Sequence, residues 1–544
     1  MNAVALDPTT ELEMLRAEIA QRDAVIAKRD AVIAKRDAEI AERDAEIDRR
    51  DAVIAQHDTV LGKRDREIRL QSARIEQLAQ VIAKFQRMQF AARSEKFDPT
   101  QQALFDDAFG ADLGATQAEL DVLRTTPRER AQPKRQPLPP ELPRIEERIE
   151  PASCTCAACG GELHCIGEEI SEKLDVKPIE FFVRQIIRPK LACRGCETIQ
   201  TPPTLPSIID RGIAAPGLLA HVLISKYADH LPLTRQREML GRSGVDLPVS
   251  TLSEWVGATG FALQPLVDAL RSELHRASVL HADETPVQLL TPGKGKTQTA
   301  YLFAYRRGEI DEPPIIVYDF AENRSGGNAR RFLADYGGAL VVDDYAGYKS
   351  LFQSTPMREV GCWAHARRKF FELHEANKST LAADALTRIG AIYAVERDTD
   401  GMDAEQRRAH RAQHARPKVE ALIAWLESLR PSINGGSATA KAVDYLLRRT
   451  AAFTAYLDDG RFPIDNNPVE NAIRPVALGR KNWLFAGSAL AGQRAANIMS
   501  LIQTAKANGH DPHAYLRDVL TRLPTQLNSK IGELLPHTWR PATP

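Results

Sequence analysis

A seven-residue repeat near the N-terminus constrains the fold of this chain more than any other feature. Residues 22–68 repeat the unit RDAVIAK with small variations, and one large apolar residue returns every seven positions. These residues are Ile26, Ile33, Ile40, Ile47, Ile54, Leu61, Ile68, Ile75 and Ile82. Such spacing on a helix is typical of a left-handed coiled coil. We therefore expect a coiled-coil helix over residues 1–90 that associates with a second copy of the chain.

The apolar seam of this repeat is incomplete, and this leaves an alternative open. Positions three or four residues from each isoleucine carry Asp or Arg in the clearest repeats, so Ala24 and Ala27 with their equivalents must widen the apolar stripe. The alternative to self-association is a solvated single helix that is stabilised by charge pairs one turn apart.

Length and charge set broad limits on the rest of the chain. The 544 residues are enough for three or four domains. Lys plus Arg and Asp plus Glu both number 72, so only local basic patches can indicate nucleic acid. No apolar run approaches the roughly 18 residues that a membrane span needs, and the first residues lack the pattern of a signal peptide. We expect a cytoplasmic protein without a membrane partner.

Six of the seven cysteines fall between residues 154 and 196, which indicates a metal site rather than a disulfide scaffold. Cys156-x2-Cys159 and Cys193-x2-Cys196 are two pairs separated by 33 residues. Four thiolates in two pairs suit one structural, tetrahedral Zn²⁺. A zinc-ribbon-like module is therefore predicted over residues 152–203. Competing ligands or spare buried groups are Cys154, Cys165 and His164, whereas Cys362 is expected inside a strand of the core.

The segments on either side of this module differ in character. Residues 126–151 are rich in proline and charge, which indicates that residues 91–151 form a linker. Residues 204–275 have a helical pattern and are predicted to form a DNA-binding segment that resembles a helix-turn-helix.

The evidence for this helix-turn-helix lies in PLTRQREMLGRSGVDLPVSTLSEWV. Pro232 suits a first helical position, and Gly241 or Gly244 can end that helix. Thr251 with Glu254 makes a capping box for the next helix. The pattern is compatible with a DNA-reading element, and an ordinary helical hairpin is the alternative.

Strand patterns begin at residue 276 and predict a core that extends to residue 510. The segments SVLHAD, TAYLFAYRRG and PPIIVYDFA indicate three antiparallel strands, and residues 326–363 then alternate helix, strand, helix, strand. This order is typical of a ribonuclease-H-like sheet. Residues 370–460 lack strand patterns and form an all-helical insertion, and residues 511–544 form a C-terminal helical element. The chain is thus predicted to be a multidomain α+β protein.

Two aspartates are expected at neighbouring strand ends of this core. Asp283 ends the first strand and Asp343 the fourth, and adjacent carboxylates repel unless a cation lies between them. Oxygen ligands of this kind suit Mg²⁺, and Glu470 could complete a two-metal site. The alternatives are local roles: turn formation for the aspartates, and for Glu470 a capping box with Asn467, with Pro468 starting the helix.

Several longer motifs resemble the DDE transposases of the insertion-sequence-66 family. They are LHADETPVQLL, VVDDYAGY, GCWAHARRKFFEL and DNNPVENAIRPVALGRKNWLFAGS, together with FAARSEKF, the cysteine segment and the tail NIMSLIQTAKANGHDPHAYLRDVLTRL. The resemblance covers residues 90–525 and implies that Asp283, Asp343 and Glu470 are catalytic and hold two Mg²⁺ or Mn²⁺ ions. The chain departs from the usual family pattern at Asp344, where Gly is common, at Asn471, where Arg is common, and in FAARSEK. Asp343 and not Asp344 is therefore predicted to be the ligand.

Basic residues beside the acids are predicted to contact DNA. Around the glutamate they are Arg474, Arg480 and Lys481, with Trp483 available to stack on an unpaired base; after the fifth strand they are Arg367, Arg368 and Lys369. The alternatives are a basic surface helix with Trp483 in the core, and a solvated face.

Together these features predict a transposase that binds the terminal inverted repeats of its element, cleaves a DNA strand and joins the 3′-hydroxyl to target DNA. The expected partners are element ends and target DNA, a second copy of the chain through the coiled coil, and accessory proteins of the same element. The expected location is the cytoplasm, associated with the nucleoid. The alternatives are a non-catalytic, zinc-containing DNA-binding regulator and a metal-dependent nuclease without strand transfer.

Overall fold

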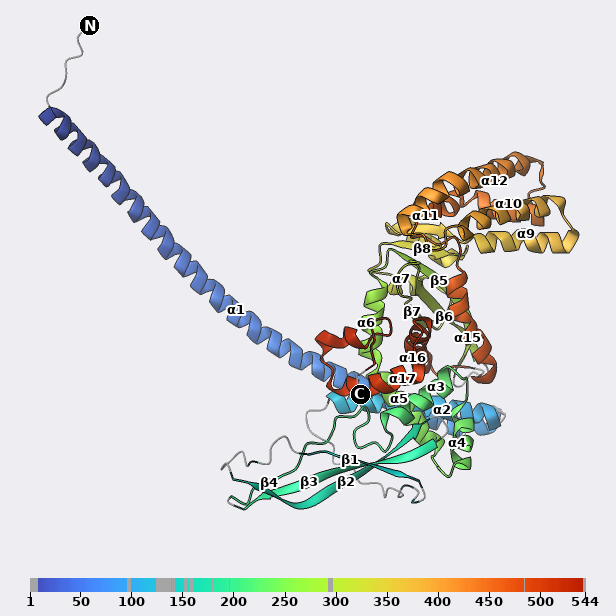
Figure 1. Ribbon diagram of the computed structural model, residues 1–544, viewed down its shortest axis with the longest axis horizontal. Helices are drawn as coiled ribbons and strands as arrows, with labels where there is room; N and C mark the ends of the chain where they lie inside the picture. The colour runs from blue at the N-terminus through green and yellow to red at the C-terminus, as the bar shows by residue number, and fades with distance from the viewer. Residues whose placement is uncertain are drawn as a thin grey trace, which may run out of the picture. The chain divides into compact units, whose positions relative to one another are not determined.

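The structure is a computed structural model that describes residues 8–94, 99–123, 138, 140, 142–150, 155, 161–177, 180–194, 196–291, 297–483 and 485–541. The described chain is a multidomain mixture of helices and sheets (Figure 1). It divides into two compact units, residues 1–73 and 74–544, which are described separately.

The first unit, residues 1–73, contains the greater part of the heptad helix. Helix α1 runs without a break over Pro8–Ser94, so the long helix predicted from the repeat is confirmed. The heptad residues Ile47, Ile54, Leu61 and Ile68 are exposed on it. Self-association through these residues stays a prediction.

A small sheet follows the repeat, formed by β1 (Arg144–Arg148), β2 (Leu163–Lys177), β3 (Glu180–Cys193) and β4 (Ile199–Gln200). The strand order is β1-β3-β2, and β4 pairs with β3. The segment between the two cysteine pairs therefore forms strands, as predicted. The expected linker is wrong in part, because it contains α2 (Pro99–Leu123) and β1, which pairs parallel to β3. Its charge misled the prediction: β1 is held by backbone pairing and by ion pairs such as Arg184–Glu147 at 2.8 Å, with little apolar burial.

Four helices come next: α3 (Pro216–Tyr227), α4 (Leu233–Arg242), α5 (Val249–Ala262) and α6 (Gln264–Leu274). Gly244 has a φ of 78° just after α4, the left-handed backbone that ends many helices. The predicted capping box at Thr251 is wrong, because α5 begins at Val249 behind Pro248, whose fixed φ suits a helix start. Residues 255–260 of α5 are all buried, and a Cβ on Gly257 would lie 1.9 Å from the Ala111 carbonyl of α2. This burial favours the helical-hairpin alternative.

The central sheet has the order β7-β6-β5-β8-β9. Its strands are β5 (Val279–Leu290), β6 (Thr297–Arg307), β7 (Ile316–Ala321), β8 (Ala339–Val342) and β9 (Arg358–Gly361), with α7 (Gly326–Phe332) and α8 (Ala346–Ser354) between the last three. The first three strands are antiparallel, and β8 and β9 are parallel to β5, as predicted. The expected end of the first strand at Asp283 is wrong, because β6 continues to pair with β5 as far as Leu290.

Residues 370–460 contain only helices, as expected for the insertion. They comprise the greater part of α9 (Trp363–Asn377), then α10 (Thr380–Arg397), α11 (Ala404–His410), α12 (Arg416–Leu429), α13 (Ala438–Leu447) and α14 (Thr450–Thr454). All of these helices except α11 share a hydrophobic core with one face of the sheet, which includes Val341 and Val360. Figure 1 shows the helices beside β8. Cys362 is buried but is the N-cap of α9, one residue beyond β9, so its expected place inside the strand is wrong.

The chain then returns to the sheet with α15 (Asn467–Trp483), α16 (Ala489–Ala507) and α17 (Pro512–Arg522). Helix α16 lies along β7, the edge strand (Figure 1). Backbone N–H groups of Ile316 and Tyr318 donate to the hydroxyls of Thr504 and Ser500 at 3.0 and 2.8 Å, and that of Phe320 donates to the Gln493 carbonyl group at 3.1 Å. Side chains of a helix thus accept the hydrogen bonds of the edge strand that a sixth strand would otherwise accept. Within the described residues, no helix is long and apolar enough to span a membrane.

Candidate active site

Three acidic side chains converge where β8 ends beside β5. The last parallel pair is His281 with Val341, so Asp283 and Asp343 both stand two residues further along. Glu470 lies in the first turn of α15, which packs against β5. Burial first, and then the negative charges of Glu284, Asp343 and Glu470, raise the pKa of Asp283 to about 7. The structure therefore brings the three sequence-predicted acids within electrostatic reach of one another.

The two adjacent aspartates after β8 have different partners. The Asp343 carboxylate accepts a hydrogen bond from the Tyr345 N–H at 2.8 Å. The Asp344 carboxylate is 3.0 Å from Lys349 Nζ and 3.9 Å from Arg449 Nε. Asp344 is thus occupied by cations, and it is absent from the charges that raise the pKa of Asp283. These contacts support Asp343 as the acid that faces Asp283.

The start of α15 is fixed to the sheet by a residue that the sequence did not reveal. Asn466 is buried; its Oδ1 is 2.9 Å from His281 Nδ1, and its Nδ2 donates to the Ala282 carbonyl at 2.9 Å. Burial lowers the pKa of His281 to about 3, so this imidazole is neutral. Since Asn466 immediately precedes the helix, the contacts hold the first turn of α15 over β5. The sequence indicates only that His281 lies on the same face of β5 as Asp283, because residues two positions apart in a strand point to the same side.

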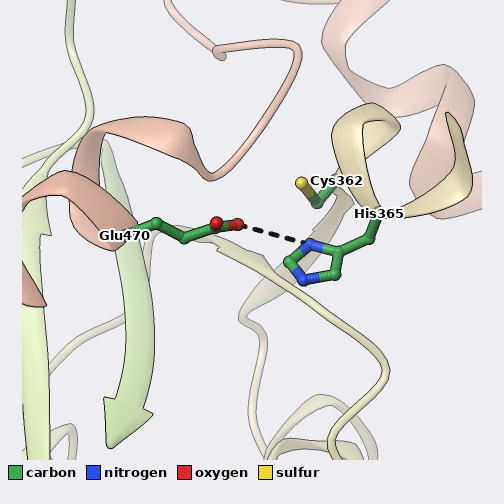
Figure 2. A group of neighbouring side chains, drawn as sticks. All are labelled: Cys362, His365 and Glu470. Carbon is green, nitrogen blue, oxygen red and sulfur yellow. Dashed lines mark ion pairs between the residues drawn. The ribbon is translucent and has the colours of Figure 1, made fainter. Parts of the chain in front are cut away.

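Glu470 does not cap its own helix. The helix begins at Asn467, one residue earlier than expected, and Asn467 N–H donates to Asp465 at 3.1 Å. The Glu470 carboxylate instead faces α9, where its Oε1 is 3.6 Å from His365 Nδ1 (Figure 2). Its Oε2 is 3.4 Å from Arg368 Nη2. The capping-box alternative is therefore wrong, and Glu470 instead pairs with His365 and Arg368 near the start of α9.

A fourth acid beside the site, Glu284, is paired with a cation of its own. The Glu284 side chain is 3% exposed, and Arg324 Nε and Nη2 donate to its Oε1 at 2.9 and 2.5 Å. The Tyr348 hydroxyl donates to its other oxygen at 3.2 Å. With its own cation in place, Glu284 is not a candidate for metal binding. The sequence gives no sign of this pair, because Glu284 and Arg324 are 40 residues apart.

The predicted DNA-contacting residues are in three different situations. Arg474, Lys481, Arg367, Arg368 and Lys369 are exposed. Arg480 Nη1 donates to the Pro286 carbonyl of β5 at 2.8 Å, so this side chain has a structural partner that was not expected. Trp483 is partly buried against the main core and lines a cavity of about 100 Å³ with Tyr227, Phe320 and Phe485. This position favours the alternative of a place at the edge of the core, and stacking of Trp483 on DNA stays a prediction.

Half of the predicted zinc ligands can be placed. Cys193 is buried at the end of β3 and Cys196 is exposed in the turn that follows. Cys156 and Cys159 lie outside the described residues, as does Cys154. Thr155 pairs with Glu162, however, and the next residue, Leu163, pairs with Cys193. The described residues Thr155 and Glu162 therefore lie near Cys193, and the four-thiolate site stays a prediction.

Comparison with known families gives four matches along the chain. The model described as "Transposase IS66 family" matches residues 211–494, and "IS66 C-terminal element" matches residues 500–537. The model described as "zinc-finger binding domain of transposase IS66" matches residues 153–197, and "Transposase C of IS166 homeodomain" matches residues 77–146.

Curated relatives occur in Sinorhizobium fredii (strain NBRC 101917 / NGR234). Uncharacterized protein y4jD is 37% identical over 479 residues, which cover 84% of this chain and 94% of the relative. Uncharacterized protein y4qI is 36% identical over 481 residues, covering 85% of this chain and 89% of the relative. Uncharacterized protein y4hP is 35% identical over 450 residues, covering 79% and 81%.

Proposed function

Because the chain belongs to the IS66 family of transposases, we propose that it cleaves and joins DNA with a metal-dependent site made of Asp283, Asp343 and Glu470. The observation that carries the proposal is the raised pKa of Asp283 among three neighbouring acids. Its pKa is raised to about 7 by burial and by neighbouring acids, two of which are the other members of the site. Such a cluster is stable as carboxylates only when a cation is bound among them.

The donor set fits Mg²⁺ or Mn²⁺. Asp283 and Asp343 supply oxygen atoms from adjacent strands, and Glu470 supplies a third carboxylate from a helix that is fixed by Asn466. When bound, a pair of such ions activates the attacking oxygen and stabilises the leaving oxygen of an in-line phosphoryl displacement. The sheet order, three antiparallel strands followed by two parallel ones, supports a ribonuclease-H-like core that positions these acids.

The chain's own residues would bind and orient the DNA. Arg474 and Lys481 lie exposed on the same helix as Glu470, and Arg367 and Lys369 lie exposed on α9. Their charges can neutralise phosphates on either side of the scissile bond. Arg368 pairs with Glu470 at 3.4 Å, which leaves it close enough to the acids to reach the same phosphate.

The remaining parts would assemble the complex. A structural Zn²⁺ held by Cys156, Cys159, Cys193 and Cys196 would stabilise the small sheet, and α1 would join two copies so that both element ends are held together. We place the reaction in the cytoplasm, on DNA of the nucleoid, with accessory proteins of the element as further partners.

The test is incubation of the full chain with Mg²⁺, a duplex that carries the element's ends, and a target plasmid. Nicking at the element end followed by joining to the plasmid is the expected result. Nicking without joining would favour a nuclease, and binding without nicking would favour a DNA-binding regulator.

Two variants test the site within this assay. Asp343→Asn should abolish nicking while leaving DNA binding intact, because it removes a metal ligand. Asp344→Gly should retain substantial nicking, since that carboxylate pairs with Lys349 and Arg449. Normal nicking by the first variant with loss in the second would refute the assignment.

A further inference from the structure

A cysteine, a histidine and a glutamate meet beside the three acids. Cys362 caps the N-terminus of α9, His365 is one turn further along that helix, and Glu470 faces them from α15 (Figure 2). One ligand atom from each residue lies within 4.8 Å of the other two. Sulfur, imidazole nitrogen and carboxylate oxygen are a donor set that favours zinc and similar transition metals over Mg²⁺.

Two of these atoms are available as metal ligands. His365 Nδ1 and Glu470 Oε1 are both buried without a hydrogen-bond partner among the described residues. They are 3.6 Å apart, which is too long for a hydrogen bond. Ligand atoms that bind one tetrahedral zinc at roughly 2.0–2.3 Å stand about 3.3–3.8 Å from each other. The separation therefore matches an edge of a zinc coordination shell.

The surroundings of the cysteine and the glutamate suit such an ion. Cys362 Sγ accepts a hydrogen bond from the Asn466 N–H at 3.1 Å, an interaction that also stabilises a bound thiolate. Burial raises the pKa of the Cys362 thiol to about 12, so an incoming metal must displace its proton. Arg368 contacts Glu470 Oε2 and leaves Oε1 available.

We propose that Cys362, His365 and Glu470 form a second transition-metal site, of the zinc class, and that its occupation inhibits DNA cleavage. The inhibition rests on the proposed function, whereas the binding does not. An ion bound between α9 and α15 would occupy the Glu470 carboxylate through its Oε1. Asp283 and Asp343 would then lack their third carboxylate. Zinc would act as a competitor of catalysis without contacting either aspartate.

The first experiment counts zinc in the full chain after equilibration with a small excess of Zn²⁺ and desalting. Wild type should hold about two ions per chain, one in the four-cysteine site and one in the new site. Cys362→Ser should hold about one, because the serine hydroxyl can accept the Asn466 hydrogen bond but is a poor zinc ligand. Cys193→Ser, which retains the new site, is the matched control and should also hold about one.

His365→Ala tests the same site at a partly exposed residue, so the count does not depend on substitution in the core. Replacement of zinc by Co²⁺ adds a spectroscopic test. Cys193→Ser loaded with Co²⁺ should retain a sulfur-to-metal absorption band that disappears when Cys362→Ser is added. One zinc in the wild type, or an unchanged count in both Cys362→Ser and His365→Ala, would overturn the site.

The second experiment measures Mg²⁺-dependent nicking as Zn²⁺ is added. Cys362→Ser should need at least tenfold more Zn²⁺ than wild type for half inhibition, with equal nicking when Zn²⁺ is absent. Equal inhibition of both proteins would overturn the competition. A chain that holds two zinc ions but never nicks DNA would refute the proposed function and leave the metal site standing. A chain that nicks DNA but holds only one zinc ion would refute the second metal site and leave the proposed function standing.

Discussion

Replacement of Asp283 by Asn should make the metal-free protein more stable and inactive at the same time. The carboxyl is buried beside three other acids, Glu284, Asp343 and Glu470. Glu284 pairs with Arg324 and Glu470 pairs with Arg368. Asn keeps the size of the side chain, and its Oδ1 can still accept the Glu284 N–H bond that the aspartate accepts at 2.9 Å. The change therefore removes the charge and little else.

The magnitude follows from the pKa of Asp283, which rises from 3.8 to about 7 on folding. A carboxyl with a raised pKa binds its proton more tightly in the folded state, so the folded state loses stability as pH rises from about 4 to 7. The cost is fully present above pH 7 and absent below pH 4. Three pKa units at about 1.4 kcal/mol each set an upper limit of roughly 4 kcal/mol, and we expect Asp283→Asn to gain about 2–4 kcal/mol at pH 8.

Thermal unfolding in EDTA at pH 4.5 and pH 8 measures this gain. Each kcal/mol shifts the melting temperature by about 2–4 °C for a domain of 150–250 residues, so the variant should melt several degrees above wild type at pH 8 and close to it at pH 4.5. Added Mg²⁺ should raise the melting temperature of wild type alone. Asp344→Asn is the control, because it makes the same substitution at an exposed carboxylate that pairs with Lys349. A variant that melts below wild type at pH 8 would refute the reasoning.

Three further perturbations test other parts of the molecule. Cys193→Ser should lose the structural zinc and lower the melting temperature of the small sheet; full zinc content in the four-cysteine site would count against that assignment. Arg474→Ala with Lys481→Ala should weaken DNA binding uniformly across sequences and reduce its salt dependence by about two phosphate contacts, and an unchanged salt slope would exclude phosphate contact. Deletion of residues 1–88 should lower the assembly state in sedimentation; an unchanged state would indicate a solvated helix.

Periodicity and strand order were predictable because they depend on local pattern. The heptad isoleucines fixed α1, and alternating apolar runs gave the order of the central sheet. Boundaries failed where a distant partner decides them: β5 continues past Asp283 because β6 remains paired with it. The capping box at Thr251 failed because Pro248 starts the helix two residues earlier.

The site was predictable to a similar extent. The three acids follow elements whose order the sequence reveals, so their convergence could be anticipated. The residues that hold them could not, because Asn466 reaches His281 across 185 residues and Arg324 reaches Glu284 across 40. The unexpected partner of Arg480 has the same origin, since the Pro286 carbonyl lies 194 residues away on β5. Such pairings produce no periodic pattern in a single sequence.

The hydrogen bonds from β7 to α16 determine where this chain can be truncated without loss of solubility. The family match to the core ends at residue 494 and the match to the C-terminal element begins at residue 500, so the boundary falls inside α16. A truncation there would keep Gln493 and remove Ser500 and Thr504, which leaves two buried backbone N–H groups of β7 without acceptors. The strand would become a template for pairing with other chains. The shortened protein should aggregate, so the C-terminal element is required to keep the core soluble.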